Sequence, residues 1–147
     1  MKKKFFVING PNLNMLGERE PELYGEDSLE QIIDYTTQRL LPHDVNCEWF
    51  QSNVEGELVS HIQSIVQRND LEALIINPAA YSHTSVAILD ALLMVKIPIV
   101  EVHLTNTCQR DHFRQRKLTA RAAVSIIEGL GRDSYWIAIY SQLILGS

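Results

Sequence analysis

The sequence predicts an α/β fold in which helices cover both faces of a parallel β-sheet. Two observations carry this prediction: apolar runs of strand length recur along the chain, and segments with the apolar spacing of amphipathic helices lie between them. Such alternation is typical of right-handed βαβ units. With 147 residues, of which 46% are hydrophobic and 21% are charged, the chain is expected to form one domain with its own core.

The first predicted strand is the uninterrupted apolar run at residues 5–8, which a Gly-Pro pair ends. Ser28 and Gln31 have the spacing of a capping box, so a helix is expected to begin at Ser28. Pro42 is expected to end this helix, and residues 45–50 read as the second strand.

The middle of the chain repeats the pattern. Residues 58–66 carry the apolar positions of a helix face, and residues 73–76 and 97–102 are apolar runs typical of buried parallel strands. A helix over about 84–95 is expected between these two strands. It is apolar on more than one side, which suggests burial between subunits, with packing inside one chain as the alternative.

The last third is expected to contain a short polar helix at 109–116, a fifth strand around 123–127 and a final helix capped by Asp133. Five strands in one compact domain favour a flavodoxin-like three-layer sandwich with strand order 2-1-3-4-5.

The charge and motif content exclude several classes of function. The net charge of −5 and the lack of a basic stripe argue against nucleic acid as the main partner. No apolar run has the length of a membrane span, and no glycine-rich phosphate-binding motif is present. Cys47 and Cys108 form no CxxC pair, so we expect two reduced thiols in a cytoplasmic protein.

In open parallel sheets, ligands bind beyond the carboxyl ends of the strands, where the strand order reverses. The segments that follow the first, third and fourth predicted strands, residues 10–14, 77–85 and 101–106, are all rich in polar side chains. They are therefore expected to converge on one site. The long polar connection from 10 to 27 has the length of a functional lid.

Two pairs of side chains in these segments suggest acid–base chemistry. Glu101 and His103 lie two apart at a strand end, so they share a face, and their spacing fits a general acid or a surface pair equally well. His83 and Asp90 are seven apart and would share a face of the predicted helix. Spacing alone favours a helix-terminal histidine and a solvated aspartate for that pair.

Arginines supply a second chemical element. Arg110 and Arg114 have i, i+4 spacing and would present two guanidinium groups to an anion, or pair with Asp111 as surface residues. Arg19 and Tyr24 both lie in the long first connection. A tyrosine acts as a base only as its phenolate, which a neighbouring arginine in a closed site would stabilise. A loop Arg and Tyr with no joint role is the alternative.

Five segments in order resemble the signatures of the type II 3-dehydroquinate dehydratases. They are GPNLNMLG at 10–17, the Arg-Glu-Pro and Tyr-Gly pieces within 19–25, QSNVEG at 51–56, INP and HTSVA within 76–87, and VEVHLTN at 100–106. The resemblance spans nearly the whole chain. It implies a flavodoxin-like fold and one catalytic domain over 1–147 that dehydrates 3-dehydroquinate to 3-dehydroshikimate.

The resemblance also implies roles for the catalytic residues. Tyr24, held as phenolate near Arg19, would take a proton from the carbon next to the ketone. Asn12 would help to stabilise the enolate oxygen through a water molecule. His103, oriented by Glu101, would protonate the departing hydroxyl.

Further residues would bind the substrate, an anion. Asn77 and the backbone amides of Leu104 and Thr105 would hold its carboxylate, and His83 and Arg114 would bind its ring hydroxyls. Asp90 would reach in from a neighbouring subunit of a homododecamer built from trimers. A lid over about 18–26 would close on the site, and no metal or organic cofactor is implied.

The chain departs from the family pattern where many members have other residues, at Ala79, Ile88-Leu89, Lys117, Ser125 and Ser134. Three other functions stay open at this point. The chain could be a flavodoxin-like module that binds a flavin or a metabolite, a metal-dependent hydrolase using His83, His103 and Asp90, or a folded but inactive family member.

Overall fold

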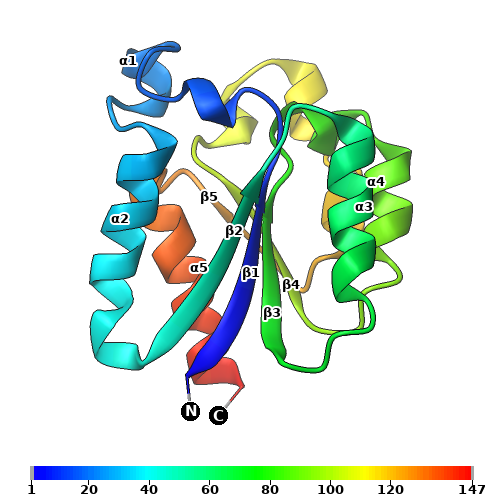
Figure 1. The fold of residues 1–147 in the computed structure, drawn as a ribbon. Coiled ribbons are helices and arrows are strands. Elements are labelled where there is room, and N and C mark those ends of the chain that lie inside the picture. The colour runs from blue at the N-terminus through cyan, green and yellow to red at the C-terminus, as the bar shows by residue number, and fades with distance from the viewer. Residues whose placement is uncertain (1, 147) are drawn as a thin grey trace.

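The chain forms a five-stranded parallel sheet of order β2-β1-β3-β4-β5 in the computed structural model, which describes residues 2–146 (Figure 1). This confirms the predicted α/β class and strand order. Within the described residues, no helix combines the length and the apolarity needed to cross a bilayer. The strands are β1 (Lys3–Asn9), β2 (Val45–Gln51), β3 (Leu71–Asn77), β4 (Ile99–His103) and β5 (Ser125–Glu128).

Each face of the sheet has its own core, because successive side chains of a strand point to opposite faces. Phe5 and Val7 of β1 pack with residues of α2 (Leu29–Leu40) and α5 (Ser134–Leu145). Phe6 and Ile8 pack on the other face, with residues of α3 (Glu55–Ile65) and α4 (Val86–Leu92). Figure 1 shows the two helix layers with the sheet between them.

Helix starts follow the sequence at α2 and differ from it at α5. The Ser28 hydroxyl accepts from the Gln31 amide at 3.2 Å and the Gln31 side chain accepts from the Ser28 amide at 2.8 Å, which confirms the capping box. Asp133 holds the N-cap position of α5, but its carboxylate caps no backbone amide. It accepts instead from the Tyr35 hydroxyl at 2.6 Å and the Trp136 indole at 2.7 Å, which joins α2 to α5.

Two expected helices differ from the prediction: one is shorter, and the other is not an α-helix. Ser85 has an extended backbone and caps α4, so His83 ends a separate 3-10 turn, η3 (Ala79–His83). The prediction that His83 and Asp90 share one helix is therefore wrong. The predicted polar helix at 109–116 is instead two 3-10 turns, η4 (Thr107–Gln109) and η5 (His112–Gln115).

The ends of β1 and β3 meet at a point where only glycine fits. A Cβ on Gly10 would lie 2.4 Å from the Pro78 carbonyl oxygen. The Gly10 amide donates to the Asn77 carbonyl at 2.8 Å, so the two backbones run in direct contact. This contact brings the segments that follow β1 and β3 to one place beside the end of β4.

Candidate active site

A cavity of about 200 Å³ lies beyond the carboxyl ends of β1, β3 and β4. It is the place predicted from the reversal of strand order. Every predicted site residue except Glu101 and Asp90 lines its wall, and these are Asn12, Arg19, Tyr24, Asn77, His83, His103, Leu104, Thr105 and Arg114. The structure thus brings together side chains from four separate segments of the sequence.

The His103 and Glu101 side chains form a buried pair and not a surface pair. His103 is 5% exposed and Glu101 is 0% exposed, and His103 Nε2 lies 2.7 Å from Glu101 Oε2. Because a carboxylate only accepts hydrogen bonds, Nε2 carries the proton in this contact. The other ring nitrogen, Nδ1, is then left for a ligand in the cavity, as a general acid requires.

Two hydroxyl groups hold the same carboxylate from behind. The Ser82 hydroxyl donates to Glu101 Oε2 at 2.8 Å, and the Thr119 hydroxyl donates to Glu101 Oε1. Both residues are 0% exposed. The sequence analysis missed them because neither carries a motif, and Thr119 belongs to a 3-10 turn, η6 (Thr119–Ala122), that is 18 residues from Glu101 in the chain.

His83 is oriented by the backbone. Its Nδ1 lies 2.7 Å from the Arg116 carbonyl oxygen, so Nδ1 donates and Nε2 is an acceptor in the neutral ring. The pKa of His83 is lowered, mainly by burial and further by nearby positive groups, although the Arg116 carbonyl opposes the shift. Its ring lies 6.1 Å from the His103 ring, centroid to centroid. His83 can therefore accept a hydrogen bond from a ligand that also reaches His103.

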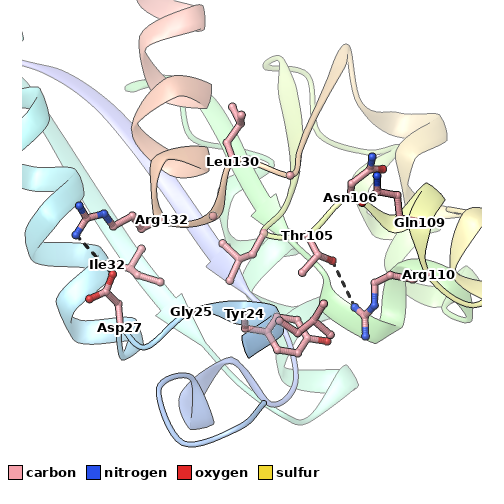
Figure 2. Close-up of a pocket in the computed structure, with 14 residues that line it drawn as sticks. Tyr24, Gly25, Asp27, Ile32, Thr105, Asn106, Gln109, Arg110, Leu130 and Arg132 are labelled. Carbon is pink, nitrogen blue, oxygen red and sulfur yellow. Dashed lines mark hydrogen bonds and ion pairs between the residues drawn. The ribbon is translucent and has the colours of Figure 1, made fainter. Parts of the chain in front are cut away.

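Tyr24, at the end of the short helix α1 (Pro21–Tyr24), lies close to two arginines. The Arg19 and Arg110 guanidinium carbons lie 4.7 and 5.2 Å from the ring centroid. Arg110 also contacts the Thr105 hydroxyl at 3.4 Å, and Figure 2 shows it beside Tyr24. Two positive charges therefore lie within cation–π distance of the Tyr24 ring.

Arg110 and Arg114 both line the cavity, where their guanidinium groups can face an anion. Arg114 donates to Asp111 at 3.1 Å, which is the ion pair that the sequence offered as an alternative, while it also lines the cavity. Arg110 turns instead toward Tyr24. The two side chains do not have the spacing of neighbours on one α-helix, because Arg110 follows η4 and Arg114 lies in η5.

The floor of the cavity is a buried polar chain. Asn77 donates to the Tyr135 hydroxyl at 3.0 Å, and that hydroxyl donates to Asn9. The Asn77 side-chain oxygen accepts from the Ala79 amide at 3.1 Å. Burial raises the pKa of Tyr135, so it stays a neutral hydroxyl. These contacts fix the Asn77 carboxamide and leave one of its two N–H protons for a ligand.

The charge of the cavity suits an anion. Arg19, Arg110 and Arg114 line it, and no aspartate or glutamate is among the described residues of its wall. A cluster of cations in a partly enclosed site raises the local concentration of anionic ligands. Asp90 lies exposed on α4, outside the cavity wall of its own chain.

A second cavity, of about 620 Å³, adjoins the first and shares four of its residues, Tyr24, Leu104, Thr105 and Arg110 (Figure 2). Its other lining residues include Asp27 and Arg132, an ion pair at 3.7 Å. The tyrosine therefore stands in the wall between the two spaces.

Comparisons with known proteins agree with this geometry. A model of the family described as dehydroquinase class II matches residues 3–143. A 3-dehydroquinate dehydratase of Aliarcobacter butzleri is 47% identical over 140 residues, which are 95% of this chain and 84% of the relative. One of Prochlorococcus marinus is 48% identical over 137 residues, 93% of this chain and 91% of the relative.

A solved structure agrees as well. The crystal structure of a type II dehydroquinase from Butyrivibrio crossotus superposes with a TM-score of 0.92 at 37% identity, over 97% of this chain and 98% of that one. The match thus covers both the sequence and the fold over nearly the full length. The chain belongs to the class II dehydroquinase family.

Proposed function

We propose that this chain, as one catalytic domain, dehydrates 3-dehydroquinate to 3-dehydroshikimate by trans elimination through an enolate, in the shikimate pathway or in quinate breakdown. The observation that carries the proposal is the cavity itself, whose wall holds a tyrosine close to two guanidinium groups together with His103, which is paired to the buried Glu101. A base and an acid in one anion-attracting cavity are the two groups that an elimination of water requires.

Tyr24 is the base of the proposed reaction. As phenolate, it takes a proton from the carbon next to the ketone, and the electron pair of that C–H bond forms the enolate while the ketone oxygen gains negative charge. Arg19 and Arg110 stabilise the phenolate before the transfer. Asn12 stabilises the enolate oxygen through a water molecule.

His103 is the acid. When the enolate reverts to a ketone, the bond between the β-carbon and its hydroxyl breaks, and His103 donates a proton from Nδ1 so that water leaves. Glu101 stabilises the positive imidazolium through its contact with Nε2. Tyr24 has then gained one proton and His103 has lost one, and exchange with water restores both.

The remaining predicted residues hold the substrate. Asn77, with the backbone amides of Leu104 and Thr105, binds the carboxylate, while His83 and Arg114 bind ring hydroxyls. The carbonyls of His103 and Leu104 accept from the Gly129 and Gly131 amides, at 3.2 and 3.0 Å, which keeps the backbone of this loop in place. The segment at about 18–26 acts as a lid that carries Arg19 and Tyr24 and excludes water. The proposed reaction needs no metal or organic cofactor.

We also propose that the chain forms a homododecamer built from four trimers, in which Asp90 reaches the substrate of a neighbouring subunit. Support comes from α4, where Asp90 is exposed together with the apolar side chains of Val86, Leu93 and Met94 near it. Light scattering measures the mass of the assembly in solution, and the mass of a single chain would contradict this proposal. In the assembled enzyme, Asp90→Ala weakens substrate binding, whereas Asp34→Ala, an exposed acid on α2, leaves it unchanged.

We place the enzyme in the cytoplasm. Cys47 and Cys108 are both free, as expected for a reducing compartment. Burial raises the pKa of the Cys47 thiol to about 12, which keeps this residue an unreactive thiol.

The test of the mechanism is Tyr24→Phe, with Tyr140→Phe on α5 as the matched control. Tyr24→Phe removes only the hydroxyl, so calorimetry should show substrate binding within a few-fold of the unchanged protein, while kcat falls by at least about a hundredfold. Tyr140→Phe should leave both unchanged. Full turnover by Tyr24→Phe would remove Tyr24 from the mechanism.

A further inference from the structure

The Glu101 carboxylate is fully buried, and two of its three hydrogen bonds come from residues outside the quoted family motifs, Ser82 and Thr119. We propose that Thr119, assisted by Ser82, is a positioning residue for the acid of the reaction. It fixes the Glu101 carboxylate and, through it, the orientation and proton of His103. This inference rests on the proposed function, because it assigns a role within the same reaction.

A buried carboxylate needs donors, because the loss of water around the charge is expensive unless hydrogen bonds replace it. Glu101 is 0% exposed, and among the described residues its one ion-pair partner within 4 Å is His103. Within the described part of the chain, no lysine or arginine forms an ion pair with Glu101. The two hydroxyls of Ser82 and Thr119 therefore supply most of the neutral hydrogen bonding to this charge.

The two oxygens of the carboxylate are held unequally. Oε2 accepts from both His103 and Ser82, at 2.7 and 2.8 Å. Oε1 accepts from Thr119. Removing the Thr119 hydroxyl would leave a buried anionic oxygen without that donor, whereas Oε2 would still keep two. Thr119 is thus the donor that stops the carboxylate from rotating about its terminal bond.

The hydroxyl protons of Ser82 and Thr119 both point to Glu101 in this arrangement. Each hydroxyl has one proton to donate, and the Ser82 and Thr119 oxygens lie 3.1 Å apart. When both protons point to Glu101, the two hydroxyls have none left for each other. Glu101 is then a pure acceptor of three donors, and the proton shared with His103 stays on Nε2 of the imidazole.

The position of Thr119 depends on contacts between distant segments. Its turn, η6, is tied to η3 by the Leu118 amide, which donates to the Ser82 carbonyl at 2.7 Å. The same contact holds the Thr119 and Ser82 hydroxyls together beside the Glu101 carboxylate. Neither Thr119 nor Glu101 lines the cavity, so loss of the hydroxyl should change the proton transfer and leave substrate binding largely intact.

The test uses Thr119→Val, which removes the hydroxyl at nearly constant volume, and Thr119→Ser, which restores it. Ser82→Ala is a second variant that removes the other hydroxyl without adding atoms. The control is Thr36→Val on α2, since Thr36 is 1% exposed and its hydroxyl has no hydrogen-bond partner among the described residues. All are measured as full-length protein for kcat, KM and the ¹⁵N resonances of the His103 ring, which His103→Asn identifies.

We expect Thr119→Val to lower kcat by about tenfold to a hundredfold, the cost of misplacing a catalytic group, with KM within about twofold. Thr119→Ser should recover most of the loss, and Thr36→Val should lose nothing. The His103 ring resonances should shift or broaden in Thr119→Val and return in Thr119→Ser. Ser82→Ala should show a smaller loss of the same kind, because Oε2 keeps its contact with His103.

An unchanged kcat in Thr119→Val would overturn the inference, and so would a lower kcat with unchanged His103 resonances. If Thr119→Val does not fold, Ser82→Ala decides by the same two measurements. The resonances need no turnover, so they still test the positioning role if the unsubstituted protein proves inactive on 3-dehydroquinate. In that case the proposed function fails, and the effect of Thr119 on His103 is judged separately.

Discussion

Ala79 has a left-handed backbone conformation, with φ of 53°, in the loop that follows β3. A left-handed conformation at a residue with a side chain has a physical consequence. An L-residue with a side chain pays about 1–2 kcal/mol in this region, and part of that cost is offset because glycine loses more chain entropy on folding. The fold therefore carries a small strain in the wall of the catalytic cavity.

We predict that Ala79→Gly raises the free energy of unfolding by up to about 1 kcal/mol. Gly131 is the matched control, because its φ of 55° is nearly the same and a Cβ there would meet no atom within 4 Å. Gly131→Ala should lower the free energy of unfolding by a similar amount. Urea denaturation measures both, and two changes of the same sign would refute this explanation.

His83 gives a prediction about pH. Its folded pKa lies below the usual value of about 6.5, first because of burial. As the pH falls through about 6.5, the unfolded chain binds a proton here before the folded chain does, so this residue lowers stability progressively until its folded pKa is passed.

The variant His83→Gln should lack this contribution. Its free energy of unfolding should therefore fall less between about pH 7 and the folded pKa of His83 than that of the unsubstituted protein. Urea denaturation at a series of pH values measures the difference. A steeper fall in His83→Gln would mean that the shift has the opposite sign.

At the scale of elements, the starts of α4 and α5 contain two buried serines with opposite roles. The Ser85 hydroxyl accepts from the Ile88 amide at 2.9 Å and caps α4. Ser134 has a buried hydroxyl without a hydrogen-bond partner among the described residues. A buried hydroxyl that is unpaired destabilises a fold, whereas a capping hydroxyl stabilises it.

We therefore predict opposite signs for the same substitution. Ser85→Ala should lower the free energy of unfolding by about 1 kcal/mol through loss of the cap. Ser134→Ala should raise it by about 1 kcal/mol, because the unpaired hydroxyl is removed. Thermal or urea unfolding of the two variants checks this, and equal losses of stability would show that Ser134 has a partner in solution.

The sequence predicted elements where the signal is local and failed where it is tertiary. The capping box at Ser28 and the uninterrupted apolar run of β1 are local, and both are confirmed. The helix was predicted to begin at about 84, whereas Ser85 has an extended backbone and α4 begins at Val86. Long-range contacts such as Asp133 with Tyr35 leave no periodic trace in the sequence.

The site shows the same division. Strand ends and motif resemblance together located nine residues of the cavity wall. They could not show that Arg110 lies over Tyr24, since that contact depends on how the segment that carries Tyr24 packs against the segment that follows β4. Nor could they find Thr119, because its contact with Glu101 joins the turn η6 to β4, which are distant in the sequence.

At the scale of the whole molecule, the fold separates support from chemistry. Two apolar cores, one on each face of the sheet, hold the strands, and the residues proposed for chemistry gather at one end of β1, β3 and β4. The Gly10–Pro78 contact fixes the relative positions of two of these strand ends. Variation in surface helices can therefore alter assembly while the cavity is preserved.

The central claim is that this cavity dehydrates 3-dehydroquinate with its own side chains. The most direct measurement mixes the purified protein with 3-dehydroquinate, without added metal or cofactor, and follows the near-ultraviolet absorbance of the conjugated enone that dehydration creates. We expect a rise in absorbance that persists after treatment with a chelator. A flat trace from folded and assembled protein would contradict it.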